Sequence, residues 1–541
     1  MRAIELEKLS PEQLKNAKPL LNIIEELNTE LLALMKKCQE LQDEINRLKG
    51  EQGRPDIKPD KENSNRNINV SSEKERKNIR GKKKRKKRKK RNLQYHETVS
   101  SNIDKSILPT DALSKGYSRK IYQGIKIELH NVCVQREVYY SPSESKTYIA
   151  DLPSGYDSVT YTPELKTLIA ELKFKNMSEP KILEFLCDQG VQITAGTISN
   201  ILMHVGKDIF LVEKNEIYEA GLASTDYQQT DTTGARENGK NRHSHIVCNV
   251  FHSTFFTRDR QDRSTILDIL RNDKPRDYRL NKTAFELFEI LRVPLKHRES
   301  LLPVQSEAAL DKAEVESIII KRIPRVNDAS KLKILDAAYI AGYHAENPLR
   351  ILLTDDAPQY NLIPEYSALC WIHEGRHYKK LNPVVPVHRR KLEKFRKKLW
   401  NYYALLLKYK KNPSKARSKM LHEKFDELFS ITTGYDELDE RIAKTNSKKE
   451  KLLLVLKFPF LPLHNNASEL GARALVRQRD VSLQTKSRNG TDVRDAYLTV
   501  IETAKKLSVN VHSYLLDRIH KHYYMPSLAC IIRKNACASF P

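Results

Sequence analysis

The chain has 541 residues, enough for roughly two to four domains, and its 95 Lys and Arg against 69 Asp and Glu give a formal charge of +26. This imbalance excludes an ordinary neutral surface and favours a polyanionic partner, most simply nucleic acid. Seven cysteines stand singly without CxxC spacing, which excludes a disulfide framework and a cysteine-rich zinc site. Because no apolar run approaches a membrane span and no signal-peptide pattern is present, we expect a cytoplasmic, nucleoid-associated protein and no membrane partner.

Residues 1–50 are predicted to form a coiled-coil (leucine-zipper) segment. Leucine recurs at every seventh position from Leu20 to Leu48. In each heptad a second position would also face a partner helix, and together the two positions form a seam. This second position holds mostly aliphatic residues: Ile24, Leu31, Cys38 and Ile45. Pro19 just before the pattern and Gly50 after it suggest its ends. A seam that is regular at both positions favours a homo-oligomer, and the alternative is an amphipathic helix packed on its own domain.

Residues 51–115 are predicted to be a disordered basic linker, because they lack hydrophobic periodicity. Within it, Lys74–Arg91 contains fourteen Lys or Arg and one Glu, a net charge of +13. Such a run binds phosphates without reading sequence, although a nuclear-import signal has the same composition. The DNA-binding residues expected at its centre are Lys82, Lys83, Lys84 and Arg85.

Two small modules are predicted next. Residues 116–161 alternate weakly and suggest a β-rich module, in which Cys133 and the nearby His130 are too few ligands for structural zinc. Residues 162–220 are predicted to be helical, with a helix-turn-helix-like pair over Pro180–Gln189 and Thr194–His204. Two ordinary packed helices remain the alternative. The exposed, DNA-facing residues would be Thr194, Thr197 and Asn200.

A catalytic core is predicted over residues 221–510. The segment Ala223–Arg236 is expected to be a strand carrying Asp226 and Asp231, and the chain returns as a second strand over Ser244–Phe255. A third run near Phe256 completes a meander that resembles the opening of a ribonuclease-H-like sheet. Because the two aspartates lie an odd number of residues apart, only one can face a shared site.

Residues 262–348 are expected to be mostly helical, and the apolar run that follows predicts a buried strand ending at Asp355 and Asp356. Strand tips are where α/β folds place catalytic groups, although the same pair could simply begin a turn. A further strand is predicted over Ser367–Trp371. A basic helical insertion is predicted at about residues 385–457, solvated but able to grip DNA backbone, with Leu392, Phe395, Leu399 and Leu406 at helical spacing.

A late helix is predicted to carry Glu469, Arg473 and Arg477 on one face, because these residues are four apart. A surface row of salt bridges is the alternative. Carboxylates from two strands and one helix suit Mg²⁺ or Mn²⁺, which take oxygen ligands, and two such ions can clamp a phosphoryl transfer. The two arginines would contact the phosphate backbone. Residues 511–541 are predicted to be a C-terminal tail.

The ordered blocks resemble those of the IS66-type bacterial transposases, which are DDE enzymes with a ribonuclease-H-like core. The blocks are TDTTG at Thr230–Gly234, LLTDDAPQY at Leu352–Tyr360, CWIHEGRHY at Cys370–Tyr378 and LHNNASELGAR at Leu463–Arg473. The sequence departs from the family pattern in having His464 before the asparagine pair, Leu470 after the glutamate and Asp356 after the second aspartate.

The resemblance implies an α/β, ribonuclease-H-like catalytic core with helical insertions, preceded by a coiled coil and a helical DNA-binding region. It selects Asp231, Asp355 and Glu469 as the catalytic and metal-binding acids. It implies double-stranded DNA as partner, at the terminal inverted repeats of the element and at the target, and possible accessory proteins of the element. Two other functions stay open: a DNA-binding regulator without chemistry, and a ribonuclease-H-like nuclease outside transposition.

Overall fold

The structure is a computed structural model that describes residues 11–48, 94, 96–103, 109, 117–156, 160–346 and 349–539. The predicted linker segment Glu51–Ser72 and the basic run with Lys82, Lys83, Lys84 and Arg85 lie outside the described residues, so their predictions stay untested. In the described part of the chain, no helix has both the length and the apolar character that crossing a bilayer requires.

The centre of the molecule is a mixed five-stranded sheet with the order β5-β4-β3-β8-β9. Its strands are β3 (Tyr227–Glu237), β4 (Lys240–Cys248), β5 (Ser253–Arg258), β8 (Ile351–Thr354) and β9 (Tyr366–Leu369). The first three form an antiparallel meander, whereas β8 pairs parallel with both β3 and β9. Asn238 and Gly239 both have positive φ and make the tight turn between β3 and β4.

The sheet differs from the sequence prediction at strand boundaries. The predicted return strand over Ser244–Phe255 is two strands, because the chain breaks at Asn249 and turns back into β5. The strand predicted over Ser367–Trp371 ends at Leu369, and Trp371 opens helix α12 (Trp371–Lys380).

Helices cover both faces of the sheet. This is required because successive side chains of β4 point to opposite faces, and apolar side chains point to both. Ile246 and Cys248 face α18 (Asn466–Ser482) and α19 (Arg488–Lys506), whereas Val247 faces the opposite core. Gly471 allows α18 to lie close on the sheet, since a Cβ there would be 2.9 Å from Ile246 Cγ2. This close packing fixes the helix that carries Glu469 relative to the strands.

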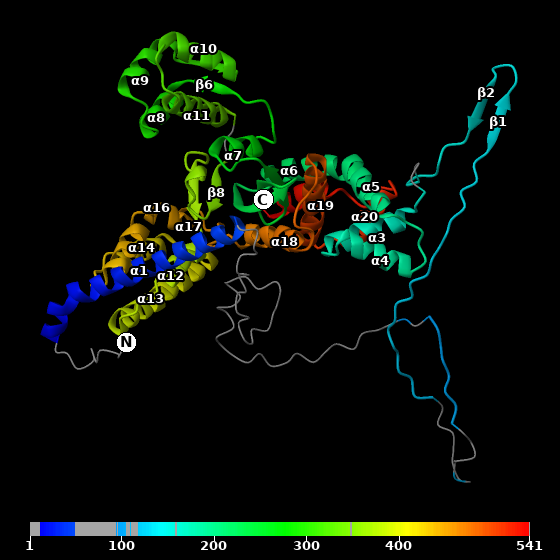
Figure 1. The fold of residues 1–541 in the computed structure, drawn as a ribbon, viewed down its shortest axis with the longest axis horizontal. Helices are drawn as coiled ribbons and strands as arrows, with labels where there is room; N and C mark the ends of the chain where they lie inside the picture. Colours follow the sequence, from blue (N-terminus) through cyan, green and yellow to red (C-terminus); the bar gives the residue numbers. More distant parts are fainter. Residues whose placement is uncertain are drawn as a thin grey trace.

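Between β5 and β8 the chain builds a lobe that stands above the sheet (Figure 1). Its elements are α7 (Arg263–Leu270), β6 (Tyr278–Leu280), α8 (Lys282–Ile290), α9 (Leu295–Leu301), β7 (Ser306–Leu310), α10 (Lys312–Arg322) and α11 (Asp328–Ala345). The predicted helical character is confirmed, but the antiparallel pair of β6 and β7, which α8 and α9 separate in the sequence, was not predicted.

The helices before the sheet share a core with the end of the chain. They are α3 (Pro163–Phe174), α4 (Glu179–Asp188), α5 (Ala195–Val205) and α6 (Leu211–Ala223). They pack with α19 and with α20 (Val511–Ile519) and α21 (Leu528–Ser539) around buried residues such as Phe210, Tyr497 and Tyr514. The prediction of a C-terminal tail over 511–541 is therefore wrong, because this segment buries apolar side chains in the helical unit.

The basic insertion folds around a core of its own. Its helices are α13 (Pro386–Lys411), α14 (Lys415–Phe429), α15 (Asp436–Asn446), α16 (Lys449–Leu452) and α17 (Leu454–Lys457). The four apolar residues predicted at helical spacing are all buried, and they pack around Trp371 and Phe425. The insertion is thus a packed unit that is solvated only on its outer faces.

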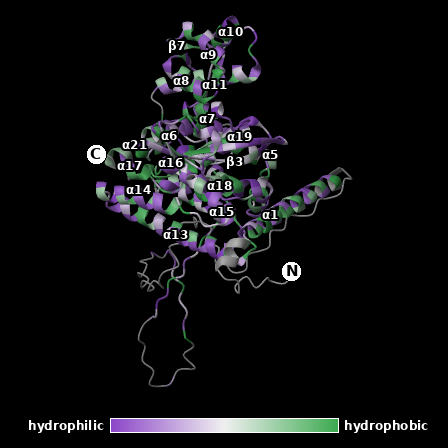
Figure 2. Cartoon of the chain, turned by 90° about the vertical axis from the view of Figure 1, so that its left-hand side faces the viewer, coloured by the Kyte–Doolittle hydropathy of each residue, from purple (hydrophilic) through white to green (hydrophobic). Residues whose placement is uncertain are grey.

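The N-terminal segment is one helix, α1 (Pro11–Leu48), with Pro19 inside it and not before it as predicted. Leu21 and Glu25 are buried, and both Glu25 carboxylate oxygens accept backbone hydrogen bonds at the start of α13, from Val384 and Val385. The seam residues Leu20, Leu27, Leu34 and Leu41 are 55–63% exposed on the rest of its surface. Figure 2 shows α1 projecting from the body of the molecule. One face of α1 is therefore docked on its own chain, while the heptad seam remains uncovered.

The β-rich module expected over residues 116–161 is reduced, among the described residues, to one exposed hairpin of β1 (Val138–Ser141) and β2 (Lys146–Ile149). The hairpin stands away from the body (Figure 1). His130 and Cys133 precede it without regular structure.

Candidate active site

Two of the predicted acids meet at one edge of the sheet. The parallel register pairs Gln229 of β3 with Leu353 of β8, so Asp231, inside β3, lies level with Asp355, the residue just after the end of β8. Asp231 is half-buried, and its Oδ1 accepts a hydrogen bond from the Thr232 amide at 2.9 Å. Asp355 is exposed at the tip of the buried strand.

The third acid comes from the first turn of α18. Asn465, the residue before this helix, is fully buried and donates through Nδ2 to the carbonyl of Thr230 at 2.7 Å. The backbone N–H of Asn465 donates to Cys370 Sγ at 3.2 Å. These two bonds tie the start of α18 to β3 and to the end of β9. They place Glu469 beside Asp231.

Electrostatics show that the three carboxylates form one cluster. The pKa of Asp231 is raised to about 6, first by burial and then by the negative charges of Asp355 and Glu469, against the amide of Thr232 and the charge of Arg376. Like charges gathered in a partly dry site are costly, so they mark a functional site more often than a structural one.

Helix α12 supplies two further residues that sequence reasoning did not assign to the site. Arg376 lies 3.1 Å from the Glu469 carboxylate, and its Nη1 lies 2.8 Å from Nε2 of His373. His373 Nε2 is 3.5 Å from Glu469, and burial lowers the pKa of His373. The sequence could have predicted that these two side chains lie together, because they are three residues apart on the helix that follows β9 and therefore share one face.

The start of α18 offers oxygen atoms that fit a hard cation. Within the described residues, Asn465 Oδ1, Asn466 Oδ1 and Glu469 Oε1 are buried and accept no hydrogen bond, although Glu469 Oε1 is within ion-pair distance of Arg376. Carboxylate and amide oxygens are the ligands that Mg²⁺ prefers. No three His, Cys, Asp or Glu side chains in the described chain are close enough to enclose an ion. The types of these ligand atoms fit Mg²⁺, although the spacing of the acids does not form a closed site.

The other two candidate aspartates point elsewhere. Asp226 precedes β3 at its far end, where Arg350 donates to it at 2.7 Å. Asp356 has a φ of 75° and forms an ion pair with Lys448 at 2.6 Å. The left-handed backbone at Asp356 turns its side chain toward the insertion, away from its neighbour Asp355.

The predicted DNA-binding residues in the described chain lie on two helices. Arg473 and Arg477 follow Glu469 along α18 and are half-buried. Thr194 caps α5, where its Oγ1 accepts from the amide of Thr197, and Asn200 is exposed further along this helix. The predicted helix pair is present as α4 and α5, with Gly190 at a φ of 84° in the turn between them. Contact of these residues with DNA stays a prediction.

Comparison with known proteins gives two matches. A family model described as "Transposase IS66 family" matches residues 341–493, which include Asp355 and Glu469 and exclude the strand of Asp231. An uncharacterized protein, y4jO, of Sinorhizobium fredii (strain NBRC 101917 / NGR234) is 31% identical over 303 residues, which is 56% of this chain and 94% of that protein. The family match covers the second strand acid, the helical insertion and the helix of the third acid, in the order that the sequence blocks predicted. The chain belongs to the IS66 family of transposases.

Proposed function

We propose that this chain is a DDE transposase with a ribonuclease-H-like core, which cleaves and joins DNA strands at the ends of its element. The observation that carries this proposal is the convergence of Asp231, Asp355 and Glu469 from two strands and a helix at one sheet edge. The antiparallel meander followed by parallel β8 and β9 supports the proposed fold.

The residues have distinct parts in the proposed reaction. Asp231, Asp355 and Glu469 would hold Mg²⁺, and two such ions would supply activation of the attacking oxygen and stabilisation of the leaving 3′-oxygen. Asn465 positions Glu469 through its bond to Thr230. Arg473 and Arg477 face the DNA backbone and hold the scissile phosphate in register.

Substitution of each acid tests the proposal. Asp231→Ala, Asp355→Ala and Glu469→Ala should each reduce Mg²⁺-dependent cleavage of the terminal repeats by about a thousandfold or more, with binding of the same DNA nearly unchanged. Double substitutions should cost little more than single ones, because the acids act as a unit.

Asp226→Ala and Asp356→Ala are the matched controls, and both should retain cleavage. A wild-type chain that binds the repeats without cleaving them would identify a regulator. Cleavage of unrelated DNA without strand joining would identify a nuclease. Robust cleavage by Asp355→Ala would refute the assignment of the acids.

We also propose that the exposed seam of α1 forms a parallel coiled coil with a second copy, which would bring two catalytic cores to two element ends. The docked face of α1 includes Leu21 and Glu25, so the seam is free for a partner helix. Replacing Leu27, Leu34 and Leu41 with Lys should yield monomers by light scattering. An unchanged mass would rule out this interface.

A further inference from the structure

A cavity of about 700 Å³ opens beside the catalytic strand, between the helical unit and the end of α18. Its walls come from the end of α3 and start of α4, from α5, from β3 beyond Asp231, and from the α18–α19 connection. The lining residues used below are Phe174, Met177, Ser199, Ala235, Gln478 and Leu483. The cavity therefore joins the helices expected to bind DNA to the strand expected to cut it.

The cavity lies at a defined distance from the acids along two elements. Gln478 follows Glu469 by nine residues on α18, which is about 14 Å at 1.5 Å per residue. Ala235 follows Asp231 by four residues on β3, which is about 13 Å at 3.3 Å per residue. Along a stacked DNA strand, with about 3.4 Å per nucleotide, this distance corresponds to about four nucleotides.

The interior suits a flat ring with polar edges. Phe174 and Met177 present apolar surface, and Phe174 already stacks on Tyr497 with 4.5 Å between ring centroids. Gln478 is about nine-tenths buried, and its Nε2 has no hydrogen-bond partner among the described residues. An unpaired buried donor costs free energy unless a ligand accepts from it. Apolar walls with one or two polar groups are typical of sites that take a small ring.

The charge of the lining fits an anion. Five lining residues are basic and one, Glu179, is acidic. The basic residues are Lys173, Arg236, Arg479, Lys486 and Arg494. Lys173 is bound to Glu179 at 2.8 Å and Arg494 to Asp495 at 2.9 Å, which leaves the charges of Arg236, Arg479 and Lys486 without an acid among the lining residues. This excess favours an occupant that carries a phosphate and disfavours a neutral or acidic peptide.

We propose that this cavity receives one unpaired nucleotide, extruded from the DNA duplex within about four positions of the cleaved bond. The base extends the stack of Phe174 on Tyr497, and its edge accepts from Gln478. The phosphates on either side lie against the basic rim. Extrusion of a base near the cut would hold the strand in place and open the duplex end for cleavage. This inference rests on the proposed function, because it requires DNA at Asp231.

The test uses the full chain carrying Asp231→Asn, so that bound DNA stays uncut. Duplexes of the terminal repeats that flank the reading frame carry 2-aminopurine, one position at a time, over the first ten nucleotides from the cleaved bond. A 2-aminopurine that leaves the stack of its neighbouring bases fluoresces more strongly. Binding should therefore raise the fluorescence several-fold at one position within about four nucleotides of the cut. Ser199→Met narrows the cavity and Gln478→Leu removes the donor, and each should abolish most of this rise.

Val212→Met is the matched control, because it also adds a Met to a helix but lies on an exposed part of α6 outside the cavity. It should leave the rise intact. Melting curves identify any variant that fails to fold, and either cavity variant alone then decides the result.

Absence of a rise at all ten positions, with a wild-type chain that binds and cleaves the repeats, overturns this inference and leaves the proposed function standing. A rise that survives both cavity variants places the unpaired base elsewhere and overturns it too. A wild-type chain that neither binds nor cleaves the repeats overturns the proposed function, and the inference with it.

Discussion

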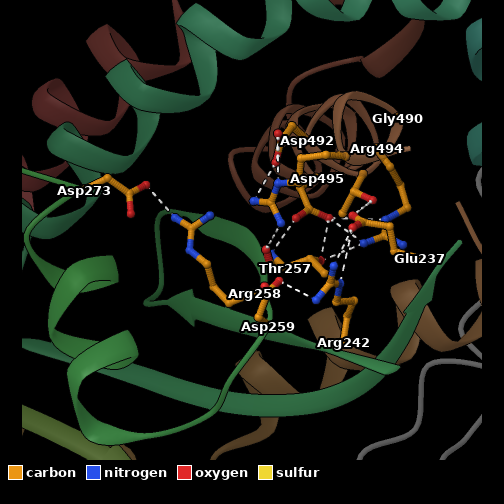
Figure 3. Close-up of polar contacts among 12 residues, drawn as sticks. Glu237, Arg242, Thr257, Arg258, Asp259, Asp273, Gly490, Asp492, Arg494 and Asp495 are labelled. Carbon is orange, nitrogen blue, oxygen red and sulfur yellow. Dashed lines mark hydrogen bonds and ion pairs between the residues drawn. The ribbon is translucent and has the colours of Figure 1, made fainter. Parts of the chain in front are cut away.

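Strand β3 contributes to two clusters of charged side chains, one around Asp231 near its middle and one around Glu237 at its end. The clusters differ in how the acids are paired with bases. At Asp231, the charges of Asp355, Glu469 and Arg376 all act on one buried carboxyl group, and among the described residues nothing donates a hydrogen bond to the buried Oδ1 atoms of Asn465 and Asn466. At the end of β3, Glu237 belongs to a network in which the acids have basic or hydroxyl partners (Figure 3). The network ties α19 to β5, and its centre, Asp495, is 1% exposed.

We interpret this difference as one between a structural cluster and the site of the proposed function. Asp495 accepts from the amide and hydroxyl of Thr257 and from Arg494, and these bonds together with Lys214 lower its pKa despite burial. At Asp231 the pKa moves the other way, because burial and like charges outweigh the one amide donor. The acids around Asp495 have basic partners between a helix and a strand (the matched cluster), whereas the acids near Asp231 have the like charges that the proposed cation would neutralise (the unmatched cluster).

Breaking the matched cluster should give the largest loss of stability. Asp495→Ala leaves Lys214 and Arg494 buried without their acid, at a cost of about 3–5 kcal/mol. The midpoint of thermal unfolding should fall by many degrees, and amide exchange should rise first in α19 and β5. Asp480→Ala, an exposed acid on α18, is the control and should change little. Equal midpoints for the two variants would show that the network does not carry the packing.

Removing the charge of Asp231 should raise the stability of the fold, which is the opposite of the effect expected for Asp495→Ala. The usual pKa of Asp is 3.8 and the folded value of Asp231 is about 6, so folding disfavours the charged form. The wild type therefore loses up to about 3 kcal/mol of stability as pH rises from 4 through 6. Asp231→Asn should be more stable than wild type at pH 7.5 in EDTA, and the gain should vanish below about pH 4, where both side chains are neutral. A less stable variant at pH 7.5 would contradict the raised pKa.

The sequence predicted Asp355 as a candidate acid because the tip of a buried strand is a local feature. An apolar run bounded by polar residues locates β8, and the residues after it must lie at the sheet edge. Position along a helix likewise put Glu469 in the first turn of α18. What local pattern could not supply was the parallel register of β3 and β8, which aligns Asp231 with Asp355. The family resemblance made that choice between Asp226 and Asp231.

Long-range partners account for what the sequence did not predict. Heptads identified the seam of α1, but the docking of Glu25 on α13 depends on a residue far along the chain. The insertion is predicted to be a solvated basic helical segment, although Leu392 and Leu399 pack on Trp371 and Phe425 in a core of their own. A C-terminal segment looks like a tail until the helices that cover it, α3 and α6, are known.

Removing a positive charge from the unmatched cluster should strengthen cation binding. Arg376 holds Glu469 at 3.1 Å, so a divalent ion must compete with the guanidinium for that carboxylate. Arg376→Ala should tighten Mn²⁺ binding, measured by electron paramagnetic resonance without DNA, by about tenfold, or about 1.4 kcal/mol. Arg350→Ala breaks an equivalent pair with Asp226 away from the site and should not change it. Weaker Mn²⁺ binding in Arg376→Ala would instead show that the arginine is needed to shape the site.

The smallest effect is expected at the exposed end of the same strand. Asp226 precedes β3 by one residue and pairs with Arg350 at 2.7 Å, but both side chains are about half exposed, at 55% and 48%. Water and salt screen such a pair, so Asp226→Asn should change the unfolding free energy by about 1 kcal/mol or less. Its Mn²⁺ affinity and its cleavage of terminal repeats should match those of the wild type. Asp226 and Asp231 have the same side chain and lie five residues apart, so their comparison isolates environment from residue type. A loss of cleavage in Asp226→Asn as large as in Asp231→Asn would mean that the far end of β3 belongs to the site, and the division between matched and unmatched clusters would fail.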